Sequence, residues 1–333
     1  MKKHSFILII SFFLTLYVSA QDIVLSQPFM SSQFLSPASV GDGLYKSRIQ
    51  SNMKAQMIDG NNLYRTIVVG YDTRFKAADN NSKNYLGIGG QIISDQVMNG
   101  VMQSNFVALN MAYHIYLDNN LYKNLSLGFG TVFAQTTLDK SKLIFGDQYD
   151  YRAIYAGTPS TENLLPFPSQ FSANAGVLYT QHNDRSFIQT GGTAFFFAKP
   201  NLTYSLVNTA PETRYRLFVN MEMPFMYYYT LALHGNFLNK KSGNQYYAGA
   251  ALGIPLTYDI DEVKRIYFGC YYRVNEAIVP TISYISDKYI LGMSYEIYNP
   301  NITGSNLRLS SFELSLSASF GKKKTDLFRT IFD

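Results

Sequence analysis

Residues 312–320 read Phe-Glu-Leu-Ser-Leu-Ser-Ala-Ser-Phe, and this stretch decides the fold class. Apolar and polar side chains alternate strictly along it, which is the period-two pattern of a β-strand. One face of such a strand favours hydrocarbon and the other favours water. The apolar face carries Phe312, Leu314, Leu316, Ala318 and Phe320, and the polar face carries Glu313, Ser315, Ser317 and Ser319.

The same alternation recurs through the chain. Residues 289–298, 101–117 and 124–134 each have one apolar face and one face of small or polar side chains. Small and polar residues suit the inward face of a membrane barrel, whose outward face meets lipid. Segments of this kind run from residues 48–57 to residues 311–320, with one expected at 226–236. They predict about fourteen antiparallel strands, an even number as such barrels require.

The composition supports a membrane barrel. Hydrophobic residues make up 47% of the chain, whereas charged residues make up only 15%. A soluble domain usually has about 25% charged residues. Beyond the N-terminus, no run approaches the ~18 consecutive apolar residues of a membrane-spanning helix. We therefore predict an all-β transmembrane antiparallel barrel, and a soluble β-sandwich is the alternative.

The lengths of the connections give an independent argument. The long ones are predicted at residues 135–170, 198–214 and 299–310, and each follows an odd-numbered strand. Alternating strands place all three on one side of the membrane. Such barrels have long extracellular loops and short periplasmic turns. This parity puts both termini in the periplasm, and a sandwich would not predict it.

Four regions are predicted along the chain. Residues 1–20 have a basic head, an apolar run and small residues before Gln21, which is typical of a signal peptide; an uncleaved anchor is the alternative. Residues 21–47, rich in proline and glycine, are expected to lie in the periplasm or to fold into the lumen as a plug. Residues 48–320 form the outer-membrane barrel. Residues 321–333 form a basic tail, in which the lysines of 322–324 are expected to be solvated.

Little in the sequence points to catalysis. The net charge of +5 is too weak to imply nucleic acid, and the single cysteine, Cys270, permits no internal disulfide. His114 and His234 fall on the lumen side by alternation. They suit either a metal site or hydrogen-bonded wall positions. The glycines of residues 87–90 lie within a strand, where close packing and curvature explain them. Asp147 suits either a cation site or a turn. No catalytic or phosphate-binding motif occurs, so we predict no enzyme, no metal and no cofactor.

Several stretches resemble the PorP/SprF family of Bacteroidetes, outer-membrane components of the type IX secretion system. The N-terminal match is to the family's F-S-Q…N-P-A-x-x-G start. Here Ser36 stands in place of the usual asparagine. Residues 86–100 resemble its glycine-rich strand and turn, and residues 142–150 resemble its K-L-x-F-G-D-Q segment. The matching N-terminal residues are Ser26, Gln27, Pro37, Ala38 and Gly41.

The C-terminal third carries the strongest resemblance. Residues 267–277 are similar to the family's strand ending in Y-R-x-N-D-A, with Arg273 and Asn275 in place and Glu276 instead of aspartate. Residues 278–298 and 312–320 continue it. We expect Arg273 and Glu276 to form an ion pair at the outer end of their strand. That pair either shapes an outer loop or is an ordinary rim salt bridge worth about 0–1 kcal/mol.

The resemblance implies a role in type IX secretion or gliding motility. Family members are linked to the secretion machinery, and some serve one large secreted surface protein by helping its export or attachment. A barrel of about fourteen strands is also wide enough to hold a ligand or a pore. The alternative function is therefore a passive channel or transporter for small apolar solutes, because fold alone does not decide function.

Overall fold

The protein is described here from a computed structural model. The structure describes residues 23–59, 61–76, 83–149, 159–162, 167–183, 185–198, 212–226, 228–241, 243–257, 264–299, 309–323 and 329–333. The predicted signal peptide of residues 1–20 lies outside this part of the chain. Within it, no helix has the length and apolar character that crossing a membrane would require.

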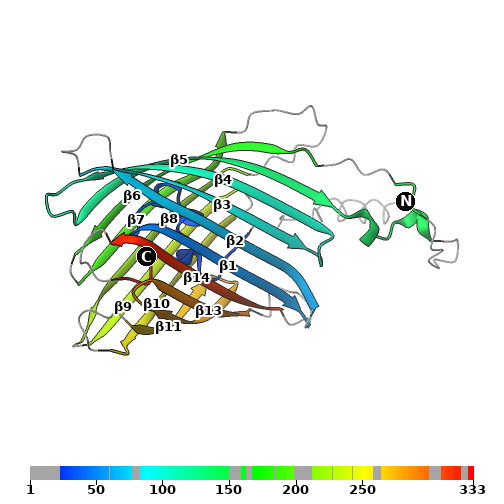
Figure 1. Cartoon of the computed structure of the whole chain (residues 1–333). Coiled ribbons are helices and arrows are strands. Elements are labelled where there is room, and N and C mark those ends of the chain that lie inside the picture. Colours follow the sequence, from blue (N-terminus) through cyan, green and yellow to red (C-terminus); the bar gives the residue numbers. More distant parts are fainter. Residues whose placement is uncertain are drawn as a thin grey trace, which may run out of the picture.

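The described residues form fourteen antiparallel strands that close into one barrel (Figure 1). Each strand pairs with its neighbours in sequence, and β1 completes the circle by pairing with β14. The predicted fold class is therefore confirmed. The strands are β1 Tyr45–Ile58, β2 Asn61–Lys76, β3 Tyr85–Val97, β4 Met102–Tyr116, β5 Lys123–Leu138, β6 Gln170–His182, β7 Phe187–Ala198, β8 Arg214–Phe225, β9 Tyr229–Lys240, β10 Gly243–Pro255, β11 Arg265–Arg273, β12 Ala277–Ile285, β13 Tyr289–Tyr298 and β14 Leu309–Lys323.

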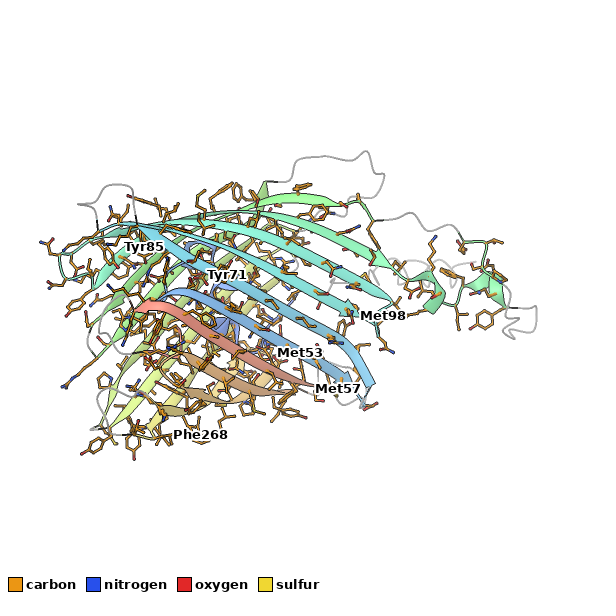
Figure 2. All side chains as sticks on the ribbon, in the orientation of Figure 1. Met53, Met57, Tyr71, Tyr85, Met98 and Phe268 are labelled. Atoms are coloured by element: carbon orange, nitrogen blue, oxygen red, sulfur yellow. The ribbon has the colours of Figure 1, made fainter. Side chains whose placement is uncertain are left out.

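The alternation of apolar and polar residues gives the barrel wall an apolar outer face and a polar inner face. Asn52 of β1 lies opposite Ser315 of β14, and both side chains are buried inside the barrel. Met53, Tyr71 and Phe268, labelled in Figure 2, are each more than 40% exposed. An apolar outer face around a closed barrel is the arrangement of outer-membrane proteins, because lipid satisfies no backbone hydrogen bonds.

Pairing defines the two rims of the barrel. Tyr45 of β1 pairs with Lys323 of β14, so both ends of the barrel sequence lie at one rim, called here the termini rim. Val97 of β3 pairs with Met102 of β4 at the opposite rim, called here the far rim. Figure 2 shows Tyr85 and Met98 at these two opposite ends.

The predicted start of one strand falls in a turn. The strand expected at residues 226–236 begins at Tyr229, because the chain turns between Phe225 and Tyr229. Met226 has a φ of 54° and is 73% exposed in that turn. Bulky apolar residues continue from β8 through the turn into β9. The hydrophobic pattern therefore placed the reversal about three residues too early.

Residues 25–44, called here the inner segment, lie inside the lumen and leave a cavity toward the far rim. The inner segment consists of three short helices: η1 Pro28–Met30, α2 Ser32–Leu35 and η2 Pro37–Ser39. Proline begins both 3-10 helices, a position where its missing N–H costs nothing. The segment contacts β4, β5 and β6 most closely and appears as the dark-blue ribbon within the barrel (Figure 1).

The last five residues also enter the barrel. Residues 329–333 are all buried, and the ring of Phe332 lies 5.6 Å from that of Phe29 in the inner segment. The sequence predicted solvation only for the lysines of 322–324, of which Lys322 is exposed, and it did not predict this burial. The reason for the burial is the apolar pair Ile331 and Phe332, which joins the hydrophobic core of the lumen.

Candidate functional site

A buried carboxylate holds the start of the inner segment. Glu313 of β14 accepts hydrogen bonds from the backbone N of Ser26 at 2.5 Å and of Gln27 at 3.1 Å. The side chain of Asn52 donates to the same carboxylate at 2.9 Å. Glu313 is fully buried. Its inward position follows directly from the alternation of β14, where it belongs to the polar face.

A second buried carboxylate, that of Glu296, contacts two cationic side chains. Glu296 Oε1 lies 2.8 Å from Lys54 Nζ and 2.6 Å from Arg273 Nη2. Ser26 Oγ donates to the same oxygen at 2.7 Å. All of these side chains are buried, and buried charges are tolerated where they are paired and hydrogen-bonded. We call Lys54, Arg273, Glu296 and Glu313 the lumen charge cluster.

A second anchor lies at the other end of the inner segment. Asp72 of β2 accepts from the backbone N of Gly41 at 2.8 Å and from Arg48 Nε at 3.1 Å. Arg48 Nη2 donates to Ser32 Oγ at 2.8 Å, and Nη1 donates to the backbone O of Asp333 at 2.8 Å. Arg48 thus joins the wall, the inner segment and the C-terminus.

Glycines in the wall let the inner segment approach the strands. A Cβ on Gly87 would lie 1.9 Å from the carbonyl O of Val40, and one on Gly128 would lie 2.3 Å from the backbone N of Ala38. Neither distance is physically possible, so both positions require glycine for this packing. The close packing predicted at residues 87–90 is thereby confirmed for Gly87. Its partner is the inner segment.

The two lumen histidines are hydrogen-bonded wall positions. His114 bonds the carbonyl O of Val40 at 2.7 Å and Ser126 Oγ at 2.6 Å. His234 bonds Asn220 Oδ1 at 2.5 Å, and its ring lies 5.1 Å from that of Phe29. The described residues contain no group of three or more His, Cys, Asp or Glu placed to hold a metal ion.

Arg273, Asn275 and Glu276 lie at the far rim, where β11 turns into β12. The expected pair is present, with Arg273 Nε 3.4 Å from Glu276 Oε2. However, the shortest ionic contact of Arg273 is the buried one to Glu296, so Arg273 is not an ordinary rim residue. Asn275 has a φ of 60°, which the tight turn between the two strands requires.

Asp147 fixes a loop rather than contacting the barrel. Its carboxylate accepts from Ser160 Oγ at 2.8 Å and from the backbone N of Thr161 at 2.6 Å. The hydrogen bond from the Ser160 side chain, followed by that from the Thr161 backbone, lowers the pKa of Asp147 below its ordinary value. The contacts of Asp147 therefore join parts of one connection that lie 13 and 14 positions apart in sequence.

The predicted residues therefore fall into separate groups. Ser26 and Arg273 meet at Glu296, and Gln27 lies beside them with its buried amide against Gly292. Pro37 and Ala38 pack on the wall at Gly128. Gly41 belongs to the Asp72 anchor. Glu276 pairs with Arg273 at the far rim, whereas Asp147 lies in the connection after β5. Because Ser26, Gln27, Pro37, Ala38 and Gly41 are buried, they offer no surface to another protein as the segment is placed here.

The sequence alone did not identify the partners of these residues. The missed residues share one feature, a charged side chain at an inward position of a strand. A charged residue at a lumen-facing position of a predicted strand could have indicated these partners, because a charge that faces the lumen needs a partner. They are Arg48, Lys54, Asp72, Glu296 and Glu313.

Solved structures with a similar barrel are only distantly related to this chain. The Ralstonia pickettii toluene transporter TbuX is 9% identical, covers 90% of this chain and 94% of its own, and has a TM-score of 0.47. A Pseudomonas aeruginosa FadL homologue is 10% identical, with coverages of 88% and 94% and a TM-score of 0.46. The Acinetobacter baumannii outer membrane protein Omp33 is 9% identical, with coverages of 84% and 100% and a TM-score of 0.42. Such low values say nothing about function.

The family of this chain follows from comparison of its amino-acid sequence with known families. No curated protein matches the chain. The family described as "Type IX secretion system membrane protein PorP/SprF" matches residues 18–318, which include every strand of the barrel except the last residues of β14. The chain therefore belongs to the PorP/SprF family of type IX secretion system membrane proteins.

Proposed function

We propose that this outer-membrane barrel is a non-enzymatic component of type IX secretion and gliding motility that docks the secretion machinery and a large secreted surface protein. In this role it assists the export or surface attachment of that partner. The observation that carries the proposal is the occupied lumen. The inner segment and residues 329–333 share one hydrophobic core with the wall and are tied to it by buried charges.

A passive channel for small apolar solutes is the second candidate. Its route would pass through the space that the inner segment occupies. Opening that route would break the hydrogen bonds of Ser26 and Gln27 to Glu313 and expose the buried charges behind them. Each hydrogen bond to such a charged group is worth about 1.5–3 kcal/mol. The secretion role needs no such opening, and we favour it for this reason.

The contact surfaces proposed for partners lie outside the lumen. The connection after β5 contains Ile144 and Tyr149, which are 59% and 45% exposed. Asp147, between them in sequence, ties this connection to Ser160 and Thr161. Exposed apolar side chains on an internally braced loop suit a protein contact. We assign this loop, on the far-rim side, to the secreted partner.

A clean deletion tests the proposal. Proteomics of the cell surface and the culture medium should then show selective loss of one or a few large secreted proteins. Permeability to small solutes should be unchanged. An unchanged surface proteome would contradict the secretion role, and conductance of the purified barrel in planar bilayers would favour the channel.

A variant in the loop sharpens this test. The double substitution Ile144→Ser and Tyr149→Ser should reproduce the loss of the secreted partner while the barrel still folds. The matched control is Met98→Ser, which changes a 55% exposed apolar residue in the β3–β4 turn of the same rim. Equal secretion defects in the two strains would count against the loop as the contact surface.

A further inference from the structure

We propose that a cavity in the far-rim half of the lumen binds a small carboxylate that carries one aromatic ring or a short acyl chain. This inference goes beyond the secretion role and does not depend on it. The cavity is formed by strands β3 to β8 together with the inner segment, which supplies Gln33 and Phe34 to its lining. It lies near the β3–β4 turn, whose Met98 is labelled in Figure 2.

The size of the cavity limits the ligand. Its volume is about 150 Å³. An apolar cavity of about that volume accepts one benzene molecule. Larger ligand sites, which bury a drug-sized molecule, are roughly 300–1,000 Å³. The cavity therefore suits a single ring or a chain of a few carbons.

The walls of the cavity are mostly hydrocarbon. Ala108, Val132 and Phe196 form one buried cluster, against which Phe106 and Phe195 pack. The rings of Phe106 and Phe196 lie 6.5 Å apart in a tilted arrangement. Aromatic walls in this arrangement receive another apolar group by edge and face contacts, which favours a ring or an acyl chain over a sugar.

Two arginines supply the charge. The guanidinium of Arg216 lies 4.8 Å from the ring centre of Phe34 and 5.3 Å from that of Phe195. That of Arg214 lies 5.3 Å from the ring centre of Phe196. Arg216 Nη1 also donates a hydrogen bond to the backbone O of Phe34. A guanidinium carries five N–H donors in a planar fork, and this geometry matches the two oxygens of a carboxylate.

The cavity lining itself carries more cationic than acidic side chains. Among the described residues that line the cavity, Asp95 is the single acidic side chain, against two arginines. Asp95 also accepts a hydrogen bond from Thr66 at 2.5 Å. The remaining polar lining residues are amides and a serine, which are neutral: Gln33, Gln91, Ser104, Asn110 and Asn174.

The test uses the full chain purified in detergent and radiolabelled phenylacetate in equilibrium dialysis. Saturable binding is expected, and the neutral isostere phenylacetamide should bind at least about tenfold more weakly, since a hydrogen bond to a charged group is worth about 1.5–3 kcal/mol. Arg214→Gln should weaken phenylacetate binding by a similar factor. The control Arg65→Gln, which removes an exposed arginine from β2, should leave binding unchanged.

Two further variants separate a ligand site from a merely structural use of the arginines. Ala108→Leu fills the cavity while keeping both arginines, and should abolish binding. Asp95→Asn removes the opposing charge and should tighten it. Absence of saturable binding, equal binding of the acid and the amide, or unchanged binding in Ala108→Leu would each overturn the inference. Heat-modified migration on gels identifies any variant that has not folded.

Discussion

The Nη2 atom of Arg273 lies 2.6 Å from Oε1 of Glu296, and both side chains are almost completely buried. Lys54 reaches the same oxygen from β1, at 2.8 Å. Ser26 reaches it from the inner segment. One carboxylate thus couples two cations of the wall to the segment inside the lumen. Removing its charge would leave two buried cations facing each other.

We expect Glu296→Gln to lower the free energy of unfolding by about 3–5 kcal/mol, because it breaks a buried ion pair on one side only. Urea-induced unfolding in lipid vesicles measures this. The control is Glu276→Gln, whose side chain is 42% exposed and should change stability by about 0–1 kcal/mol. If both variants had the same free energy of unfolding, the lumen charge cluster would not supply the expected stability.

We expect Gly128→Ala to weaken the docking of the inner segment, because the new Cβ would collide with Ala38. Overpacking of this kind costs about 1–3 kcal/mol. The matched control is Gly146→Ala, because a Cβ there meets nothing within 4 Å. Limited proteolysis should cut the inner segment faster in the first variant alone. Equal cleavage of both would argue against the close approach at Gly128.

We expect Phe332→Ala to destabilise the barrel by up to about 3–5 kcal/mol, the cost of removing a buried aromatic side chain. Its ring stacks at 5.9 Å on Phe187 of the wall, besides the contact with Phe29. Lys322→Ala, at an exposed position of the same C-terminal region, is the control and should change little. A thermal unfolding midpoint that does not move in Phe332→Ala would contradict the buried position of the C-terminus.

We expect the loop held by Asp147 to loosen in acid. The folded pKa of Asp147 is lowered from the ordinary 3.8, so its stabilising effect is complete above that value. It is lost as the pH falls through the folded pKa. Hydrogen exchange, corrected for the intrinsic rate, should show the Thr161 amide protected at neutral pH and less protected in acid. Asp147→Asn should remove this pH dependence, and a persistent dependence would assign it to another group.

The sequence by itself determined the barrel. Strict alternation, as in residues 312–320, places side chains on two faces whatever the rest of the chain does, because a strand has a local period of two. The same alternation put His114, His234 and Glu313 inside. It placed the turn between β8 and β9 about three residues too early, because apolar residues continue through that reversal.

The tertiary structure alone decided what lies inside the barrel. Ser26 meets Glu313 across 287 positions of sequence, and the backbone of Asp333 meets Arg48 across 285. The sequence allowed residues 21–47 to lie in the periplasm or in the lumen, and it predicted a basic tail at residues 321–333 without placing residues 329–333. No local pattern distinguishes these outcomes, since a buried charge is stable only where a distant group pairs or hydrogen-bonds with it, and only the closed barrel brings the two together.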